Sequence, residues 1–344
     1  MKSPALLRSL SSLLAAGTLA SIFLLSACGK SDNTAASSAS GTADSGKTLH
    51  LAFIPKGMQN VYWKSVEKGM KDAEADAQKA GVKVDIEWNG PPNEGDRAAE
   101  IALMENYIAQ KLDGIILCPM EFDALVAPSQ KARQAGIPLV IVDSPLNYKD
   151  IVAFVGTGNK AAGGMAAAEL AKELGDKGNV IMMRFLPGSA STNEREVGFL
   201  DEMQKHPNIN LVSTDNYAGD DREKAFDKAQ NLLNAYKNVD GIFTPNEPST
   251  GGMLLALEKA GLAGKVKFVG FDGGKMNMDG LAAGHIQALV LQDPYQMGYK
   301  GVTTMLDFLA GKKVDANVDT GTHLLTKDNQ NTPEIQTLLK NTVQ

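Results

Sequence analysis

The sequence predicts an α/β protein built from two similar, doubly wound lobes, and three observations support this prediction. Short apolar runs bounded by turn residues alternate with helix-length segments of mixed polarity between residues 49 and 291. The runs are continuously apolar, as a parallel sheet covered by helices on both faces requires. The folded part has roughly 300 residues, which is more than one compact core usually holds. We therefore expect two Rossmann-like lobes with about five or six strands each.

Ten segments have the length and composition of buried strands. They are 49–54, 82–88, 114–117, 139–142, 151–155, 180–183, 209–213, 241–244, 267–271 and 287–291. Helical patterns occupy the stretches between them, and the clearest are 61–80, 96–110, 159–174 and 220–236. So many strands exceed one comfortable open sheet, which again favours two.

The amino-terminal 27 residues have the organisation of an export signal. Lys2 and Arg8 supply a basic segment, and the apolar stretch 13–25 that follows is too short for a membrane-spanning helix. The string Leu25-Ser26-Ala27-Cys28 ends this region and resembles the lipobox of bacterial lipoproteins, whose cysteine is acylated. We expect residues 1–27 to be a lipoprotein signal peptide and Cys28 to be the lipid attachment site. The alternative is an ordinary secretory signal beside an unrelated cysteine.

Composition limits what the exported chain does. Residues 31–46 are almost all small or polar, so we expect a flexible tether over 28–47. The formal net charge of the chain is −6, and the sequence has no basic cluster, which argues against nucleic-acid binding. Once Cys28 carries lipid, Cys118 has no cysteine to pair with, and we expect it to be a buried apolar residue.

Polar and aromatic side chains follow several predicted strands. Asn60, Tyr62 and Trp63 come after the first strand, and Asp143 and Asp272 each follow a later one directly. Because ligand sites in doubly wound sheets lie at the carboxyl ends of strands, we expect these side chains to form a site. Amides and carboxylates bind paired hydroxyl groups, and an aromatic face covers apolar C–H groups, so the combination is typical of carbohydrate recognition. The structural alternative for each Asp is a helix cap.

From about Leu49 to the carboxyl terminus, the chain resembles the sugar-binding proteins of ABC importers, in the ribose-binding branch of the type I periplasmic binding proteins. Short blocks in the expected order carry the resemblance. They are Asn60-Val61-Tyr62-Trp63, Val142-Asp143, the segments 188–192 and 194–199, the segment 243–247, Val269-Gly270-Phe271-Asp272-Gly273 and the segment 292–298.

The resemblance implies a set of ligand contacts, carried over one position at a time. They are Asn60, Tyr62, Trp63, Asp143, Arg195, Asn246, Asp272 and Gln292. Tyr62 or Trp63 would stack on the sugar ring, and the remaining residues would bind its hydroxyl groups or ring oxygen. Two departures put ribose itself in doubt. Ser144 stands where the family's ribose-binding member has an arginine, and Asp220 stands where that member has a second stacking phenylalanine. We therefore expect a site with one cation and one ring fewer, suited to a larger sugar.

The resemblance also implies the organisation and the mechanism. The first lobe would comprise 48–153 and 292–319, and the second 154–291 and 320–344, joined by three crossings that form a hinge. The lobes would close on a monosaccharide and present it to an ABC permease. We expect an exported, lipid-anchored monomer in the periplasm or cell envelope, with no cofactor and no bound metal.

Enzyme signatures are weak in this sequence. The segment 187–191 lacks the second glycine of a nucleophile elbow, and the four histidines show no metal spacing. Glu94 and Asp96 precede a predicted helix and are interpreted as complementing its dipole. We expect no catalytic activity. Two alternatives stay open: a sensory protein that presents its ligand to a chemoreceptor or kinase, and an exported enzyme that uses carboxylates such as Asp143 and Asp272.

Overall fold

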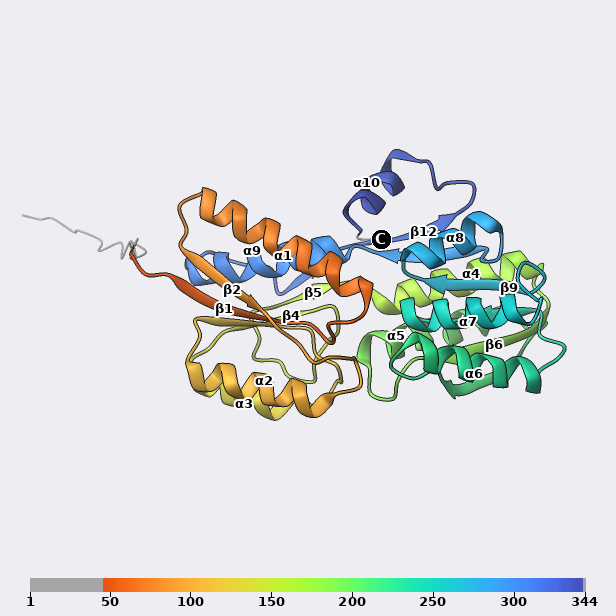
Figure 1. Cartoon of the computed structure of the whole chain (residues 1–344), viewed down its shortest axis with the longest axis horizontal. Coiled ribbons are helices and arrows are strands. Elements are labelled where there is room, and N and C mark those ends of the chain that lie inside the picture. The colour runs from red at the N-terminus through yellow and green to blue at the C-terminus, as the bar shows by residue number, and fades with distance from the viewer. Residues whose placement is uncertain (1–45, 343–344) are drawn as a thin grey trace, which may run out of the picture. The chain divides into compact units, whose positions relative to one another are not determined.

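The computed structural model describes residues 46–342, which form two six-stranded sheets (Figure 1). The first sheet has the strand order β11-β5-β4-β3-β1-β2, and all its neighbouring strands run parallel. Its strands are β1 (Leu49–Ile54), β2 (Val84–Trp88), β3 (Gly114–Leu117), β4 (Leu139–Val142), β5 (Ala153–Gly156) and β11 (Asn317–Asp319). Helices α1 (Val61–Lys79) and α9 (Pro294–Leu309) cover one face, and α2 (Arg97–Gln110) and α3 (Val126–Gln134) cover the other.

Both faces of the first sheet are buried, which explains its continuously apolar strands. In β1, Leu51 and Phe53 belong to the core under α1 and α9. Ala52 and Ile54 belong to the core under α2 and α3. Because successive strand residues point to opposite faces, a strand buried on both sides must be apolar at every position.

The second sheet repeats this arrangement with the order β12-β10-β9-β8-β6-β7. Its strands are β6 (Gly178–Arg184), β7 (Ile209–Tyr217), β8 (Gly241–Phe243), β9 (Lys267–Phe271), β10 (Ala288–Gln292) and β12 (Thr322–Thr326). Only β12 at the edge runs antiparallel to its neighbour, β10. Helices α4 (Asn159–Leu174) and α5 (Ala190–Met203) pack on one face, and α6 (Arg222–Ala235), α7 (Glu247–Lys259) and α8 (Lys275–Ala283) on the other. Helix α10 (Pro333–Asn341) adds Ile335 and Leu338 to the second of these cores.

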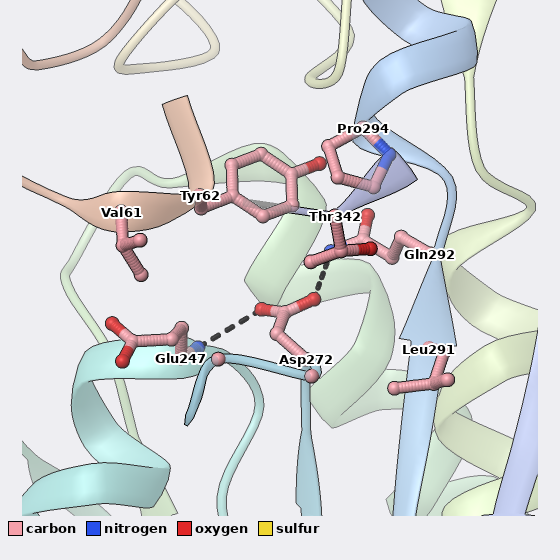
Figure 2. A pocket seen from close by; sticks show the side chains of 10 residues that line it. Val61, Tyr62, Glu247, Asp272, Leu291, Gln292, Pro294 and Thr342 are labelled. Carbon is pink, nitrogen blue, oxygen red and sulfur yellow. Dashed lines mark hydrogen bonds between the residues drawn. The ribbon is translucent and has the colours of Figure 1, made fainter. Parts of the chain in front are cut away.

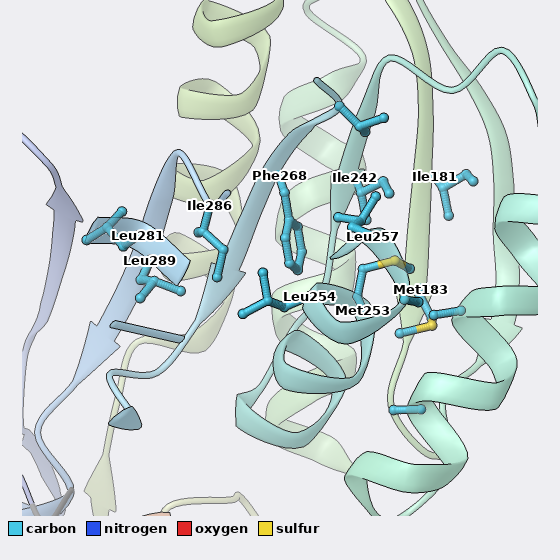
Figure 3. Packing of buried hydrophobic residues seen from close by; sticks show 14 of the residues in the cluster. Ile181, Met183, Ile242, Met253, Leu254, Leu257, Phe268, Leu281, Ile286 and Leu289 are labelled. Atoms are coloured by element: carbon cyan, nitrogen blue, oxygen red, sulfur yellow. The ribbon is translucent and has the colours of Figure 1, made fainter. Parts of the chain in front are cut away.

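The core beneath α7 illustrates how tightly the second sheet is covered (Figure 3). Met253, Leu254 and Leu257 of α7 belong to the same buried cluster as Ile242 of β8 and Phe268 of β9. All are at most 1% exposed. This packing fixes the carboxyl ends of β8 and β9, where the predicted ligand residues begin.

The chain crosses between the two sheets three times, after β5, after β10 and between β11 and β12. We name each sheet with its covering helices the first and the second lobe. The positions of two crossings differ from the prediction. Residues 154–156 were assigned to the second lobe but belong to β5 of the first sheet, and Gln292 was assigned to the first lobe but ends β10 of the second. In β10 the strand extends one polar residue, Gln292, beyond its apolar run.

All ten predicted strands are present, with ends shifted by up to four residues. The sequence analysis missed β11 and β12, which are short, partly exposed edge strands. The predicted signal peptide, Cys28 and most of the predicted tether lie outside the described residues. Within residues 46–342, no helix combines the length and apolar character needed to cross a membrane.

Candidate functional site

The eight predicted ligand residues line one cavity between the carboxyl ends of the strands of the two lobes. Residues after β1, β2 and β4 form the wall from the first lobe, and residues from α5 and the ends of β6, β8, β9 and β10 form the wall from the second. The full lining consists of Lys56, Asn60, Tyr62, Trp63, Glu94, Asp143, Phe185, Ser189, Ser191, Thr192, Arg195, Asn246, Glu247, Pro248, Asp272 and Gln292.

Asp272 follows β9 directly and joins three strand ends of the second lobe. Its Oδ2 accepts a hydrogen bond from the backbone N–H of Glu247 at 2.9 Å, and its Oδ1 accepts one from Nε2 of Gln292 at 2.8 Å. Burial raises the pKa of Asp272 to about 6, against the opposing charge of Arg195. Figure 2 shows this carboxylate facing the ring of Tyr62 across an adjoining pocket.

Asp143 follows β4 and pairs with a lysine that the sequence analysis did not include. Lys56 Nζ lies 2.6 Å from Asp143 Oδ2, and both side chains are about 5% exposed. Lys56 also donates to Ser144 Oγ at 2.7 Å. The other carboxylate oxygen of Asp143 accepts a hydrogen bond from the Tyr62 hydroxyl at 2.9 Å.

Hydrogen bonds join the two lobes at two places near this pair. Ser191 Oγ of α5 lies 2.7 Å from Ser144 Oγ and 3.2 Å from Lys56 Nζ. Close by, the backbone N–H of Phe122 in the first lobe donates to the carbonyl of Gly188 in the second at 3.0 Å. The first turn of α5 is therefore held against the Lys56–Asp143 pair.

Arg195 lies on α5 and makes three hydrogen bonds within the second lobe. Its Nε donates to Asn159 Oδ1 at 2.9 Å, its Nη1 to the carbonyl of Pro245 at 2.9 Å, and its Nη2 to Gln292 Oε1 at 2.5 Å. The guanidinium carbon stands 4.7 Å from the centre of the Phe271 ring. These contacts fix the orientation of the guanidinium group in the cavity wall before a ligand binds.

Helix packing sets the position of Arg195. A Cβ atom at Gly163 of α4 would lie 1.9 Å from the Arg195 carbonyl oxygen, and one at Gly198 of α5 would lie 1.9 Å from the carbonyl oxygen of Lys160. Only glycine permits this close approach of the two backbones, so α4 determines how deeply α5 extends into the site.

A buried glutamate, Glu94, holds side chains that line the cavity from the first lobe. Glu94 Oε1 accepts hydrogen bonds from Trp63 Nε1 at 3.0 Å and from Asn60 Nδ2 at 3.1 Å. Burial raises the pKa of Glu94, and the nearby Lys56 opposes the rise. Trp63 packs edge-on against Tyr62, with ring centres 5.1 Å apart.

Several predicted residues also serve as helix caps. Asn60 caps α1 by accepting from the Tyr62 N–H at 3.0 Å, and Asn246 caps α7 by accepting from the Ser249 N–H at 3.4 Å. Asp96 caps α2, as its predicted dipole role suggested. The same interpretation of Glu94 is wrong, because its carboxylate turns inward to the cavity wall.

Two further lining residues bear on the expected loss of a cation and a ring. Lys56 supplies a cation beside Ser144, with its Nζ 2.7 Å from Ser144 Oγ. Asp220 does not line the ligand cavity; it pairs with Lys224 and lines a neighbouring cavity. Phe185, directly after β6, supplies a ring from the second lobe. The cavity lining therefore contains two cations, Lys56 and Arg195, and aromatic rings from both lobes.

The residues missed from the sequence are Lys56, Glu94, Phe185, Ser189, Ser191, Thr192, Glu247 and Pro248. Lys56 lies two residues beyond β1, so the strand-end rule that selected Asp143 could have included it. Within residues 46–342, no group of three or more His, Cys, Asp or Glu side chains has the geometry of a metal site.

The comparisons agree with this architecture. Residues 51–313 match the family model described as periplasmic binding protein domain. The D-allose-binding periplasmic protein of Escherichia coli (strain K12) is 32% identical over 271 residues, covering 76% of this chain and 85% of that protein. The ribose import binding protein RbsB of Salmonella typhimurium is 28% identical over 277 residues, covering 80% of this chain and 90% of that protein.

Two solved structures are similar over almost their full length. A carbohydrate transporter solute binding protein from Agrobacterium radiobacter, in complex with D-arabinose, has 34% identity and a TM-score of 0.80, covering 85% of this chain and 98% of that one. An ABC transporter solute binding protein from Agrobacterium vitis with bound D-fucose has 34% identity and a TM-score of 0.81, covering 86% of this chain and 100% of that one. The fold and the family predicted from the sequence are thereby confirmed. The chain belongs to the periplasmic binding proteins.

Proposed function

We propose that this protein binds one neutral monosaccharide between its two lobes and delivers it unchanged to an ABC permease. The observation that carries the proposal is the cavity itself, which polar and aromatic side chains line from both lobes. Trp63 and Tyr62 on one side and Phe185 on the other can cover the apolar faces of a sugar ring. Asp143, Arg195, Asp272 and Gln292 provide acceptors and donors around its edge.

The charges of the cavity favour a neutral ligand. Lys56 is already paired with Asp143, and Arg222 lies 2.8 Å from Glu247. Arg195 and Asp272 both bind Gln292 and lie near each other, so their opposite charges partly balance. A charged ligand would lose its hydration on entering this network, whereas sugar hydroxyl groups can share these charge-assisted hydrogen bonds.

Related proteins support the class of ligand rather than its identity. The relatives described above bind or are solved with D-allose, ribose, D-arabinose and D-fucose, which are pentoses and hexoses. The cation of Lys56 and the ring of Phe185 remove the two reasons for doubting ribose, so the panel for testing includes pentoses and hexoses alike.

The carboxylates of the cavity are suited to binding rather than to turnover. Asp143 is held by Lys56 and Tyr62, and Asp272 by the Glu247 N–H and Gln292. A general acid or base must exchange a proton with the ligand, and these partners favour a fixed acceptor. We propose that the lobes hinge about the three crossings and that the ligand favours the closed form by binding both walls.

Export and anchoring complete the proposal. The family is extracytoplasmic, and the Leu-Ser-Ala-Cys string supports a lipid anchor at Cys28. We propose that the mature protein is a monomer tethered to a membrane by this cysteine. Mass spectrometry of the mature amino terminus should find diacylated or triacylated Cys28, and Cys28→Ala should release the protein from membranes. An unmodified terminus at another residue would refute the anchor and leave ligand binding untouched.

A thermal-shift screen of the mature protein against pentoses, hexoses and sugar alcohols tests the binding function. Ligand at a hundred times its dissociation constant should stabilise the folded protein by about 2.7 kcal/mol. Chromatography after overnight incubation should recover the sugar unchanged. No shift with any sugar would contradict the proposal, and a converted sugar would favour an enzyme.

A further inference from the structure

Ser189 stands at the amino-terminal cap of α5 but does not use its hydroxyl as a cap. Serine at this position normally accepts a hydrogen bond from a backbone N–H of the first helical turn. The Ser189 side chain makes no such bond. The residue is 2% exposed, and its Oγ finds no hydrogen-bond partner among the described residues. Ser189 nevertheless lines the ligand cavity.

The other two hydroxyl groups that α5 contributes to the cavity are already committed. Thr192 donates to the carbonyl of Ser189 at 3.3 Å, and Ser191 bonds to Ser144 and Lys56 across the lobes. A buried hydroxyl without a partner forfeits its hydrogen bonds to water, which is unfavourable unless a bound molecule replaces them. The start of α5 also carries the positive end of the helix dipole, which favours an oxygen atom there.

We propose that Ser189 is a specificity-determining residue that binds one hydroxyl group of the ligand. Its Oγ can donate and accept at the same time, as a sugar hydroxyl can, so the pair satisfies both groups. Together with Arg195 on the same helix, Ser189 would let α5 select the position or configuration of one hydroxyl. This inference rests on the proposed sugar-binding function.

The structure offers a matched control for Ser189→Ala. Ser129 of α3 is also fully buried, and its Oγ also lacks a partner among the described residues, but it lies on the outer side of the first sheet, away from the cavity lining. With a sugar identified by the screen, calorimetry should show Ser189→Ala binding about tenfold more weakly. Ser129→Ala should bind with wild-type affinity. A lower melting temperature of ligand-free Ser189→Ala with unchanged affinity would instead make Ser189 a structural cap and overturn the inference.

A series of deoxy analogues of the same sugar identifies the hydroxyl. One analogue lacks the hydroxyl group that binds Ser189. The wild type should bind this analogue more weakly than the parent sugar, whereas Ser189→Ala should bind both equally, because the variant already lacks the partner of that hydroxyl. If every deoxy analogue weakens both proteins equally, the inference fails although sugar binding stands. If no sugar binds the wild type at all, the proposed function fails first.

Discussion

Asp143 and Asp272 occupy equivalent positions in the two lobes. Each directly follows the third strand of its sheet order, β4 in the first and β9 in the second. Each is buried, and each has a left-handed backbone, with φ of 66° and 69°. Aspartate tolerates this conformation at some cost, which indicates that the position of the side chain matters more than local strain. The two carboxylates thus face one cavity from opposite lobes.

Replacing Asp272 by asparagine should weaken sugar binding by at least about tenfold. Asparagine accepts a left-handed backbone, but its amide nitrogen would face a donor, either the Glu247 N–H or Gln292 Nε2. Calorimetry measures the change. Asp279→Asn is the control, because Asp279 pairs with Lys275 on the exposed side of α8. Wild-type affinity in Asp272→Asn would remove this carboxylate from the site.

Replacing Lys56 by methionine should destabilise the ligand-free protein, by about 3 kcal/mol, because it leaves the Asp143 carboxylate buried without its cation. Adding Asp143→Asn should recover part of that loss. Urea unfolding of both variants provides the measurement. Lys68→Met, which breaks an exposed pair with Asp72, should change stability little. Equal stability of Lys56→Met and the wild type would show that the pair contributes nothing.

Glu100 should make the folded protein less stable as the pH rises. Burial raises its pKa to about 8 from 4.5, although the Met120 N–H donates to it. The folded state therefore keeps a proton that the unfolded state releases, and the contribution to stability falls between about pH 4.5 and 8. Glu100→Gln should remove this decline and raise the melting temperature at pH 8 by about 2 °C or more, with less effect at pH 5.

Glu105→Gln on the same helix is the control for this pH dependence. Glu105 is half exposed and pairs with Lys131, so its replacement should shift the melting temperature equally little at both pH values. If Glu100→Gln follows the wild-type profile throughout, another group causes the decline.

Adjacent glycines in α4 should respond differently to alanine. Gly163→Ala places a methyl group against the Arg195 carbonyl oxygen, so α5 must move, and both stability and sugar affinity should fall. At Gly164 the nearest atom, the carbonyl oxygen of Gly198, is 3.7 Å from the added Cβ. Gly164→Ala should therefore leave affinity unchanged and stabilise the helix by up to about 1 kcal/mol. Similar behaviour of the two variants would show that helix spacing does not position Arg195.

The pattern of continuously apolar runs was enough to predict ten of the strands, because strands buried on two faces are apolar at every position. It failed for β11 and β12, whose three and five residues lie at sheet edges and are mostly partly exposed or exposed. Their strand conformation depends on pairing with β5 and β10 rather than on their own composition.

The site was predictable where a residue follows a strand directly, as Asp143 and Asp272 do, where it ends a strand, as Gln292 does, or where a family motif marks it. Lys56 lies two residues beyond β1, so the same rule could have selected it. Ser189 was not predictable, since which loop side chain turns inward depends on tertiary packing. Ser144 and Asp220 alone could not reveal the content of the site, because side chains from other segments, Lys56 and Phe185, also line the cavity with a cation and a ring.

A crystal structure of the mature protein with the sugar identified by the screen tests whether the ligand is bound between the two lobes. We expect one sugar in the cavity, within hydrogen-bonding distance of Asp143 from the first lobe and of Asp272 from the second, with an aromatic ring against its face. A sugar bound elsewhere, or held by one lobe only, would contradict it.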